Sequence, residues 1–166
     1  TCDSVSGLLE ANLNRLKNLM GSFRMVAVEP TPGGPEVRNI TNELNRIMRF
    51  FREQMEAKKG VSVVILGDPD LEFKICPDCF RHVFSQLLEN SYLHAFPEER
   101  GTVTISYEVS GTDLAMRFQD DGIGLAPDSL KRIFEPFFTT GRGQGRPGLG
   151  LTIAYNAINK IGGEIS

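Results

Sequence analysis

The chain has 166 residues, with 18 basic and 21 acidic side chains, a formal net charge of -3 and 40% apolar residues. This length and composition suit one folded domain that removes about two-thirds of its unfolded surface from water. The basic residues are scattered rather than massed, so the sequence lacks the electrostatic footprint of a nucleic-acid or anionic-membrane binder. No apolar stretch approaches the roughly 18 to 20 residues of a membrane span, which predicts a soluble domain.

The cysteine content bears on the compartment of the domain, and the two ends of the sequence bear on its extent. Three cysteines do not make a disulfide scaffold, and an odd count favours a reducing compartment, so we expect a cytoplasmic domain. The chain begins at Thr1 and stops just after Gly162 and Gly163, where a turn introduces another strand. These ends predict a piece of a longer protein, shortened at its C-terminal side.

A segment rich in proline and glycine divides the first quarter of the chain from the rest. Apolar residues at helical spacing predict a connecting helix over 1–26 that packs on a partner helix; they are Leu9, Leu13, Leu16, Met20 and Phe23. Residues 27–38 are predicted to form a linker, since their prolines and glycines cannot continue that helix. The folded domain is expected over 39–166.

Hydrophobic periodicity predicts alternating helices and strands in this domain. In chain order we expect a helix over 40–59, strands over 61–66 and 71–75, a long helix over 80–94, hairpin strands over 102–109 and 113–118, a short helix over 130–134 and a last helix over 149–161. Because the hairpin requires antiparallel pairing, the fold class is α+β, with a mixed or antiparallel sheet and helices on one face.

The helix over 80–94 has two different faces. Its core stripe is apolar, whereas Gln86, Asn90 and His94 follow one another at intervals of four residues on the other side. A solvated surface face is the simple interpretation of this polar row. The functional one is a ligand site, since the amide oxygen of Asn90 suits a hard cation that is coordinated mainly by phosphates and water.

Two glycine-containing segments follow the hairpin. In Gln119-Asp-Asp-Gly-Ile-Gly124, an aspartate at a strand end could accept a hydrogen bond from an exocyclic amine, although an ordinary Asp-Gly turn also fits. The aromatic segment 133–140 then leads into the glycine-rich stretch 141–150 and a helix. That arrangement predicts a phosphate cradle at the helix N-terminus, with a flexible linker as the alternative. It matches neither a Walker A loop nor a Rossmann turn.

Taken in this order, these segments resemble the four nucleotide-binding boxes of bacterial sensor histidine kinases. The string LLENSYLHAF, QDDGIGLAP, RIFEPFFTTGRGQG and GLGLTIAYNAI carries the resemblance, which covers about Ile40 to Ser166. It implies an ATP-binding two-layer α/β sandwich of the Bergerat type, with the nucleotide between the helices and a lid. The connecting helix before Arg24 would then be the end of the kinase's dimerisation domain.

The resemblance also implies roles for individual residues. Asn90 would ligate Mg²⁺ on the triphosphate, Asp120 would read the adenine amino group, and Gln86 would position metal or water. The residues implied to contact ATP are Asn90, His94, Asp120, Gly122, Ile123, Gly124, Thr139, Gly148, Leu149, Gly150 and Leu151. Those implied to anchor the lid are Phe134, Phe137 and Phe138.

The resemblance implies a protein-histidine kinase that transfers the γ-phosphoryl group of ATP. Neither His82 nor His94 lies in the sequence setting of a phosphoacceptor, so the acceptor histidine would be on an upstream domain, in a homodimer that serves a response regulator receiver domain. Relatives that hydrolyse ATP have a glutamate at the position of Gln86, and an amide is not a general base. A GHKL-type ATPase is therefore a weaker alternative.

Two departures from the family pattern support another alternative, a degenerate nucleotide-binding or interaction module. Arg146-Pro147 replaces a Gly-Thr pair, and Pro147 has no N–H for a phosphate. Leu93 lies where many relatives have a phosphate-facing lysine.

The Cys76-Pro-Asp-Cys79 motif could also form a redox pair or, with His82, part of a zinc site. Without a second Cys-x-x-Cys, a helix-entry turn is the better interpretation.

Overall fold

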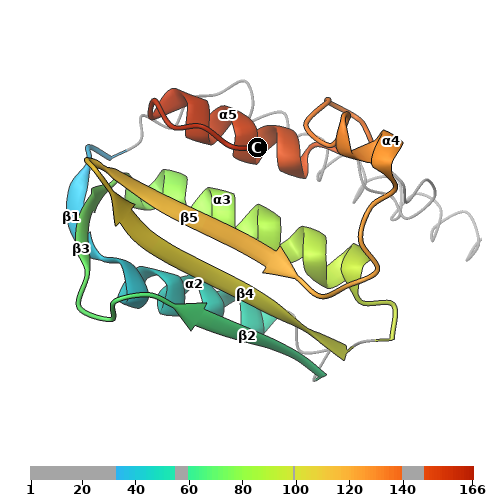
Figure 1. The fold of residues 1–166 in the computed structure, drawn as a ribbon, viewed down its shortest axis with the longest axis horizontal. Helices are drawn as coiled ribbons and strands as arrows, with labels where there is room; N and C mark the ends of the chain where they lie inside the picture. Colours follow the sequence, from blue (N-terminus) through green and yellow to red (C-terminus); the bar gives the residue numbers. More distant parts are fainter. Residues whose placement is uncertain (1–32, 55–59, 99, 140–147) are drawn as a thin grey trace, which may run out of the picture.

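The structure, a computed structural model, describes residues 33–54, 60–98, 100–139 and 148–166. Its elements are β1 (Glu36–Asn39), α2 (Ile40–Gln54), β2 (Gly60–Leu66), β3 (Glu72–Ile75), α3 (Pro77–Asn90), the π-helical turn η1 (Ser91–Ala95), β4 (Arg100–Ser110), β5 (Asp113–Asp120), α4 (Pro127–Leu130) and α5 (Gly150–Lys160) (Figure 1). No helix within these ranges has the length and apolar character to cross a membrane. The connecting helix predicted over 1–26 falls before the first described residue.

A three-stranded mixed sheet in the order β2-β4-β5 forms the centre of the fold. β2 runs parallel to β4, and β4 pairs antiparallel with β5. The predicted hairpin is confirmed: only Gly111 and Thr112 separate its strands, and Gly111 has a φ of +63°. A tight hairpin needs a residue with positive φ at this position, which glycine adopts without steric cost.

The core lies between this sheet and the helices. Alternate residues of β4, namely Val103, Ile105 and Tyr107, are buried on the face that α2 and α3 cover (Figure 1). Four helix and turn residues are almost fully enclosed against them: Ile40, Leu44, Leu88 and Phe96. The period-2 pattern of the strands and the apolar stripes of the helices meet here, which confirms an α+β fold with helices on one face of a mixed sheet.

The linker predicted over 27–38 is wrong at its C-terminal end, because residues 36–38 belong to β1. This strand pairs antiparallel with β3, with Glu36 opposite Ile75 and Asn39 opposite Glu72. The side chain of Asn39 then accepts a hydrogen bond of 2.8 Å from the backbone N–H of Asn42 and so caps α2. The prolines stop a helix, but they do not prevent the following residues from adding to a partner strand.

Proline also moves two predicted helix boundaries. The helix expected over 130–134 is found at Pro127–Leu130, and residues 131–134 form turns. The helix expected over 80–94 begins at Pro77, with Cys76 as its N-cap, and changes to a π-helical turn after Asn90. Proline fits the first turn of a helix because its fixed φ is helical. The N–H group that proline lacks would have no hydrogen-bond partner within the helix at this position. α2 is described to Gln54, short of the end predicted at Lys59.

Candidate functional site

The C-terminal ends of α3 and β5 meet at Asp120. Asp120 is the last residue of β5 and lies opposite Val103, so its half-buried side chain shares the face that packs on the helices. Its carboxylate accepts a 2.8 Å hydrogen bond from the Ser91 hydroxyl and a 3.1 Å bond from the Gly122 N–H. These two donors hold the carboxylate in one orientation, as recognition of a hydrogen-bond donor on a ligand requires.

The turn after Asp120 is packed directly against η1. A Cβ at Gly122 would lie 2.4 Å from the Cβ and 2.5 Å from the carbonyl oxygen of Ala95. That carbonyl accepts a 3.0 Å hydrogen bond from Ile123 N–H, and Gly124 has a φ of +69°. Only glycine allows the backbone to come this close at position 122. The side chain of Ile123, expected to contact the nucleotide, is 73% exposed.

Gln86 and the N-terminus of α5 lie in contact, although they are far apart in the sequence. α3 and α5 pack together, and a Cβ at Gly150 would lie 2.8 Å from Gln86 Oε1. Asn90 is one turn further along α3, at its last position, and is half-buried, as is His94 in η1. The polar row of the sequence therefore runs from the start of α5 towards Asp120.

The two segments that flank residues 140–147 touch each other. Gly148 has a φ of +66°, and a Cβ there would lie 2.6 Å from the carbonyl oxygen of Phe138. Phe137 also has a positive φ, 67°, which is rare for a bulky residue and marks backbone strain. Thr139 and Leu151 are half-buried and Leu149 is buried. Arg146 and Pro147 belong to the stretch that the structure leaves undescribed.

Replacing Gly148 with Ala is expected to destabilise the fold more than the same change at Gly111 or Gly34. Gly111 shares the positive φ but has nothing near its Cβ position, and Gly34 has neither feature. The strain of positive φ costs about 1 to 2 kcal/mol, and the contact with Phe138 adds to it at position 148. Urea unfolding of the three variants measures the order, and a G148A midpoint equal to that of G34A would contradict it.

The aromatic segment contacts α5 through Phe134 and the guanidinium of Arg132 through Phe138. The ring of Phe134 lies 5.4 Å from that of Tyr155, and its carbonyl oxygen accepts a 3.1 Å hydrogen bond from the Thr152 hydroxyl. The Arg132 guanidinium lies 4.7 Å from the centre of the Phe138 ring. Phe137 is 59% exposed. Phe134 thus packs on α5, whereas the ring of Phe138 contacts Arg132 in the turn before it.

Sequence reasoning missed two polar residues that build this region, Ser91 and Thr152. Both are buried, at 2% and 7% exposure. A signal for Ser91 was present, because it follows Leu88 by three residues and Phe84 by seven and so falls on the apolar stripe of α3. A hydroxyl at a core position indicates a buried hydrogen-bond partner, which here is Asp120.

Cys76 and Cys79 form the entry turn of α3. The Cys79 N–H donates to the Cys76 sulfur at 3.3 Å, and both side chains are buried. In the described part of the chain, no group of three or more His, Cys, Asp or Glu side chains could hold a metal ion. Burial, a hydrogen bond with Cys76 and the charges of Cys76 and Asp78 raise the pKa of Cys79 from 9.0 to about 12, against the opposing charge of Lys160.

This raised pKa predicts a loss of stability in alkali. Below pH 9, both the folded and the unfolded chain keep the Cys79 proton, so the contribution to stability is complete. As the pH rises from about 9 to about 12, the unfolded chain releases the proton first, and the free energy of unfolding falls. The free energies of unfolding of wild type and Cys79→Ala, measured as a function of pH, should therefore differ by a constant amount below pH 9 and converge above it. Curves that stay parallel to about pH 11 would refute the shift.

The comparisons with known proteins agree with this architecture. The profile of the family described as histidine kinase-, DNA gyrase B-, and HSP90-like ATPase matches residues 77–166. The sensor histidine kinase ZraS of Salmonella typhi is 43% identical over 84 residues, 49% of this chain and 18% of the relative. ZraS of Escherichia coli K12 is 36% identical over 150 residues, 89% of this chain and 31% of the relative. The chain thus spans less than a third of the length of these relatives.

Solved structures show the same fold. The nucleotide-free catalytic domain of histidine kinase ThkA superposes with a TM-score of 0.65 at 23% identity, covering 77% of this chain and 82% of that one. The chain therefore belongs to the family of histidine kinase-, DNA gyrase B- and HSP90-like ATPases, as an ATP-binding catalytic domain of the sensor histidine kinase kind.

Proposed function

We propose that this domain binds Mg-ATP between α3, β5 and α5 and transfers the γ-phosphoryl group to a histidine on an upstream domain. The observation that carries the proposal is the 2.8 Å hydrogen bond from Ser91 to Asp120. It joins the residue after Asn90 to the carboxylate at the end of β5. It supports a single site in which Asp120 would face the adenine and Asn90, at the end of α3, would face the phosphates.

The adenine end of the proposed site is formed by Asp120 and the turn after it. Ser91 and Gly122 occupy one lone pair on each carboxylate oxygen, which leaves acceptor capacity for an exocyclic amine. Gly122 lets this turn pack on Ala95, and Gly124, with open space around its Cβ position, offers backbone without a side chain to a flat ring. His94 and Ile123 would line the pocket, the latter with a side chain that is exposed in the structure.

The phosphate end is formed by Asn90 and the start of α5. Among the described residues no side chain caps α5, so the backbone N–H groups of its first turn would suit phosphate oxygens. Gly148, Leu149, Gly150 and Leu151 would supply these groups, with Thr139 on the opposite flank. The Asn90 amide oxygen is the ligand type that Mg²⁺ accepts, and bound Mg²⁺ would neutralise the triphosphate.

The chemistry that fits these residues is phosphoryl transfer by positioning and electrostatic stabilisation. Gln86 lies against Gly150, where its amide can orient a water or a metal-bound group but cannot remove a proton. Hydrolysis by a GHKL-type ATPase would need a base in this place. Because neither His82 nor His94 lies in the sequence setting of a phosphoacceptor, the acceptor histidine would be presented by another domain.

The wider setting also forms part of the proposal. Residues 1–26 would be the end of the dimerisation domain that carries the acceptor histidine, followed by a linker and by the catalytic domain to residue 166. The full protein would act as a homodimer and pass the phosphoryl group to a response regulator receiver domain. Use of ATP and the free buried thiols support a cytoplasmic location.

A calorimetric titration with a non-hydrolysable ATP analogue, with and without Mg²⁺, tests the site. We expect Mg²⁺ to strengthen binding to wild type, and Asn90→Ala to abolish that Mg²⁺ effect. Asn156→Ala, an exposed asparagine on α5, is the matched control and should behave as wild type. Absence of binding at millimolar nucleotide would refute the kinase proposal and leave a degenerate module. Transfer of labelled phosphate from ATP to the added histidine domain then tests the reaction.

A further inference from the structure

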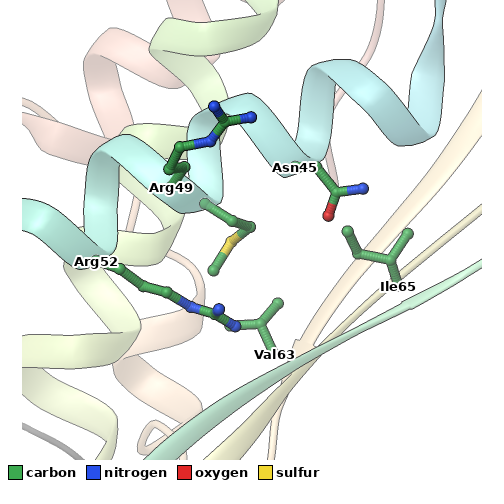
Figure 2. A pocket seen from close by; sticks show the side chains of 6 residues that line it. Asn45, Arg49, Arg52, Val63 and Ile65 are labelled. Atoms are coloured by element: carbon green, nitrogen blue, oxygen red, sulfur yellow. The ribbon is translucent and has the colours of Figure 1, made fainter.

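A pocket of about 380 Å³ lies between α2 and β2. β2 and β5 are the two outer strands of the three-stranded sheet, so the pocket is at the opposite edge from Asp120. Three apolar side chains line the pocket: Met48, Val63 and Ile65. Three polar side chains of α2 also line it: Asn45, Arg49 and Arg52. In Figure 2, the guanidinium of Arg52 extends towards Val63, and the amide of Asn45 points towards Ile65. None of these residues belongs to the proposed nucleotide site.

The two arginines of this pocket are exposed, and neither forms an ion pair with a side chain that the structure describes. The neighbouring Arg46, in contrast, is 3.0 Å from Glu43. Arg52 follows Arg49 by three residues, roughly 4.5 Å of axial rise along α2. Side chains two residues apart on an extended strand are about 6.7 Å apart, so two successive carboxylates of a strand could reach both guanidinium groups.

Strand β2, which adjoins the pocket, has none of the sequence features that usually protect an edge strand from pairing. Among the described residues, β2 pairs only with β4, which leaves its other edge without a partner strand. Its sequence, GVSVVIL, contains no charged residue and no proline across seven positions. Edge strands of monomeric proteins are normally short, charged or interrupted by proline, because a bare edge is a template for another strand.

We propose that the β2 edge and the Arg49–Arg52 pocket form a docking surface for an extended acidic peptide segment of a protein partner. The segment would add to the sheet as a fourth strand beside β2, with alternate carboxylates pointing towards the two arginines. A second copy of this chain fits less well. Symmetric pairing of two β2 edges would place both copies' arginines on the same face and next to each other, with like charges opposed.

Binding of three capped heptapeptides, measured by fluorescence anisotropy, tests the surface. One alternates threonine and glutamate, the second has lysine in place of glutamate, and the third has proline in place of threonine. We expect only the first to bind and to slow amide hydrogen exchange in residues 60–66. The lysine peptide tests charge, and the proline peptide keeps the charge but cannot pair as a strand.

The double charge reversal Arg49→Glu and Arg52→Glu should weaken binding of the threonine-glutamate peptide at least about tenfold. Arg117→Glu, an exposed arginine on β5, is the matched control and should leave it unchanged. Nucleotide affinity should be equal in all three proteins, which separates this surface from the proposed ATP site. The proposal is overturned if the peptide does not bind at millimolar concentration, if the proline peptide binds equally well, or if the chain instead self-associates through β2.

Discussion

Replacing Asp120 with Asn is expected to weaken ATP binding by roughly 10- to 100-fold. A hydrogen bond to a charged group contributes about 1.5 to 3 kcal/mol, and each 1.4 kcal/mol corresponds to a factor of ten in affinity. In the structure, both carboxylate oxygens already accept bonds, from Ser91 and from the Gly122 N–H. Asparagine has only one side-chain oxygen, so its NH₂ group would face one of these donors and turn the acceptor away from adenine.

Titration with ATP and with inosine triphosphate, which lacks the exocyclic amine, measures this effect. Wild type should prefer ATP, and the Asp120→Asn variant should lose most of that preference. Asp113→Asn, an exposed change at the opposite end of β5, is the matched control. Removal of the Ser91 hydroxyl by Ser91→Ala should give a smaller loss in the same direction. A D120N protein that still prefers ATP as wild type does would refute the assigned role.

Replacing Phe96 with Ala is expected to lower the free energy of unfolding by about 3 to 5 kcal/mol. Phe96 is 2% exposed and follows η1 directly, so its ring connects the end of the α3 segment to the sheet. A Cβ at Gly101 would lie 2.1 Å from its Cε1 atom, which shows how closely β4 packs on the ring. Loss of the ring would leave a cavity that a sheet and a helix end cannot close.

Urea denaturation followed by circular dichroism compares this variant with Phe50→Ala. Phe50 is 56% exposed on α2, so its truncation should cost less than about 1 kcal/mol. Nucleotide binding should weaken in F96A only as far as unfolding removes competent protein. Equal stability losses in the two variants would show that Phe96 does not hold η1 to the sheet.

Local patterns predicted most of the fold. Alternation of apolar residues specified the strands of the hairpin, and helical spacing specified α3 and α5 to within a few residues. Errors arose where proline or a distant partner decided the outcome. Pro77 and Pro127 start helices earlier than the apolar pattern does. β1 exists because β3 offers it an edge, and no feature local to residues 36–38 contains that information.

The sequence by itself determined the family resemblance, the α+β class and the residue types of the site, because motif residues and periodicity are readable at short range. Only the tertiary structure decided that Ser91 orients Asp120, that Gly122 packs on Ala95 and that Gln86 lies against Gly150. It also placed Arg49 and Arg52 beside β2, the edge strand of the described sheet. Each of these contacts joins segments on different elements, and such partners are chosen by the packing of the whole domain rather than by neighbouring residues.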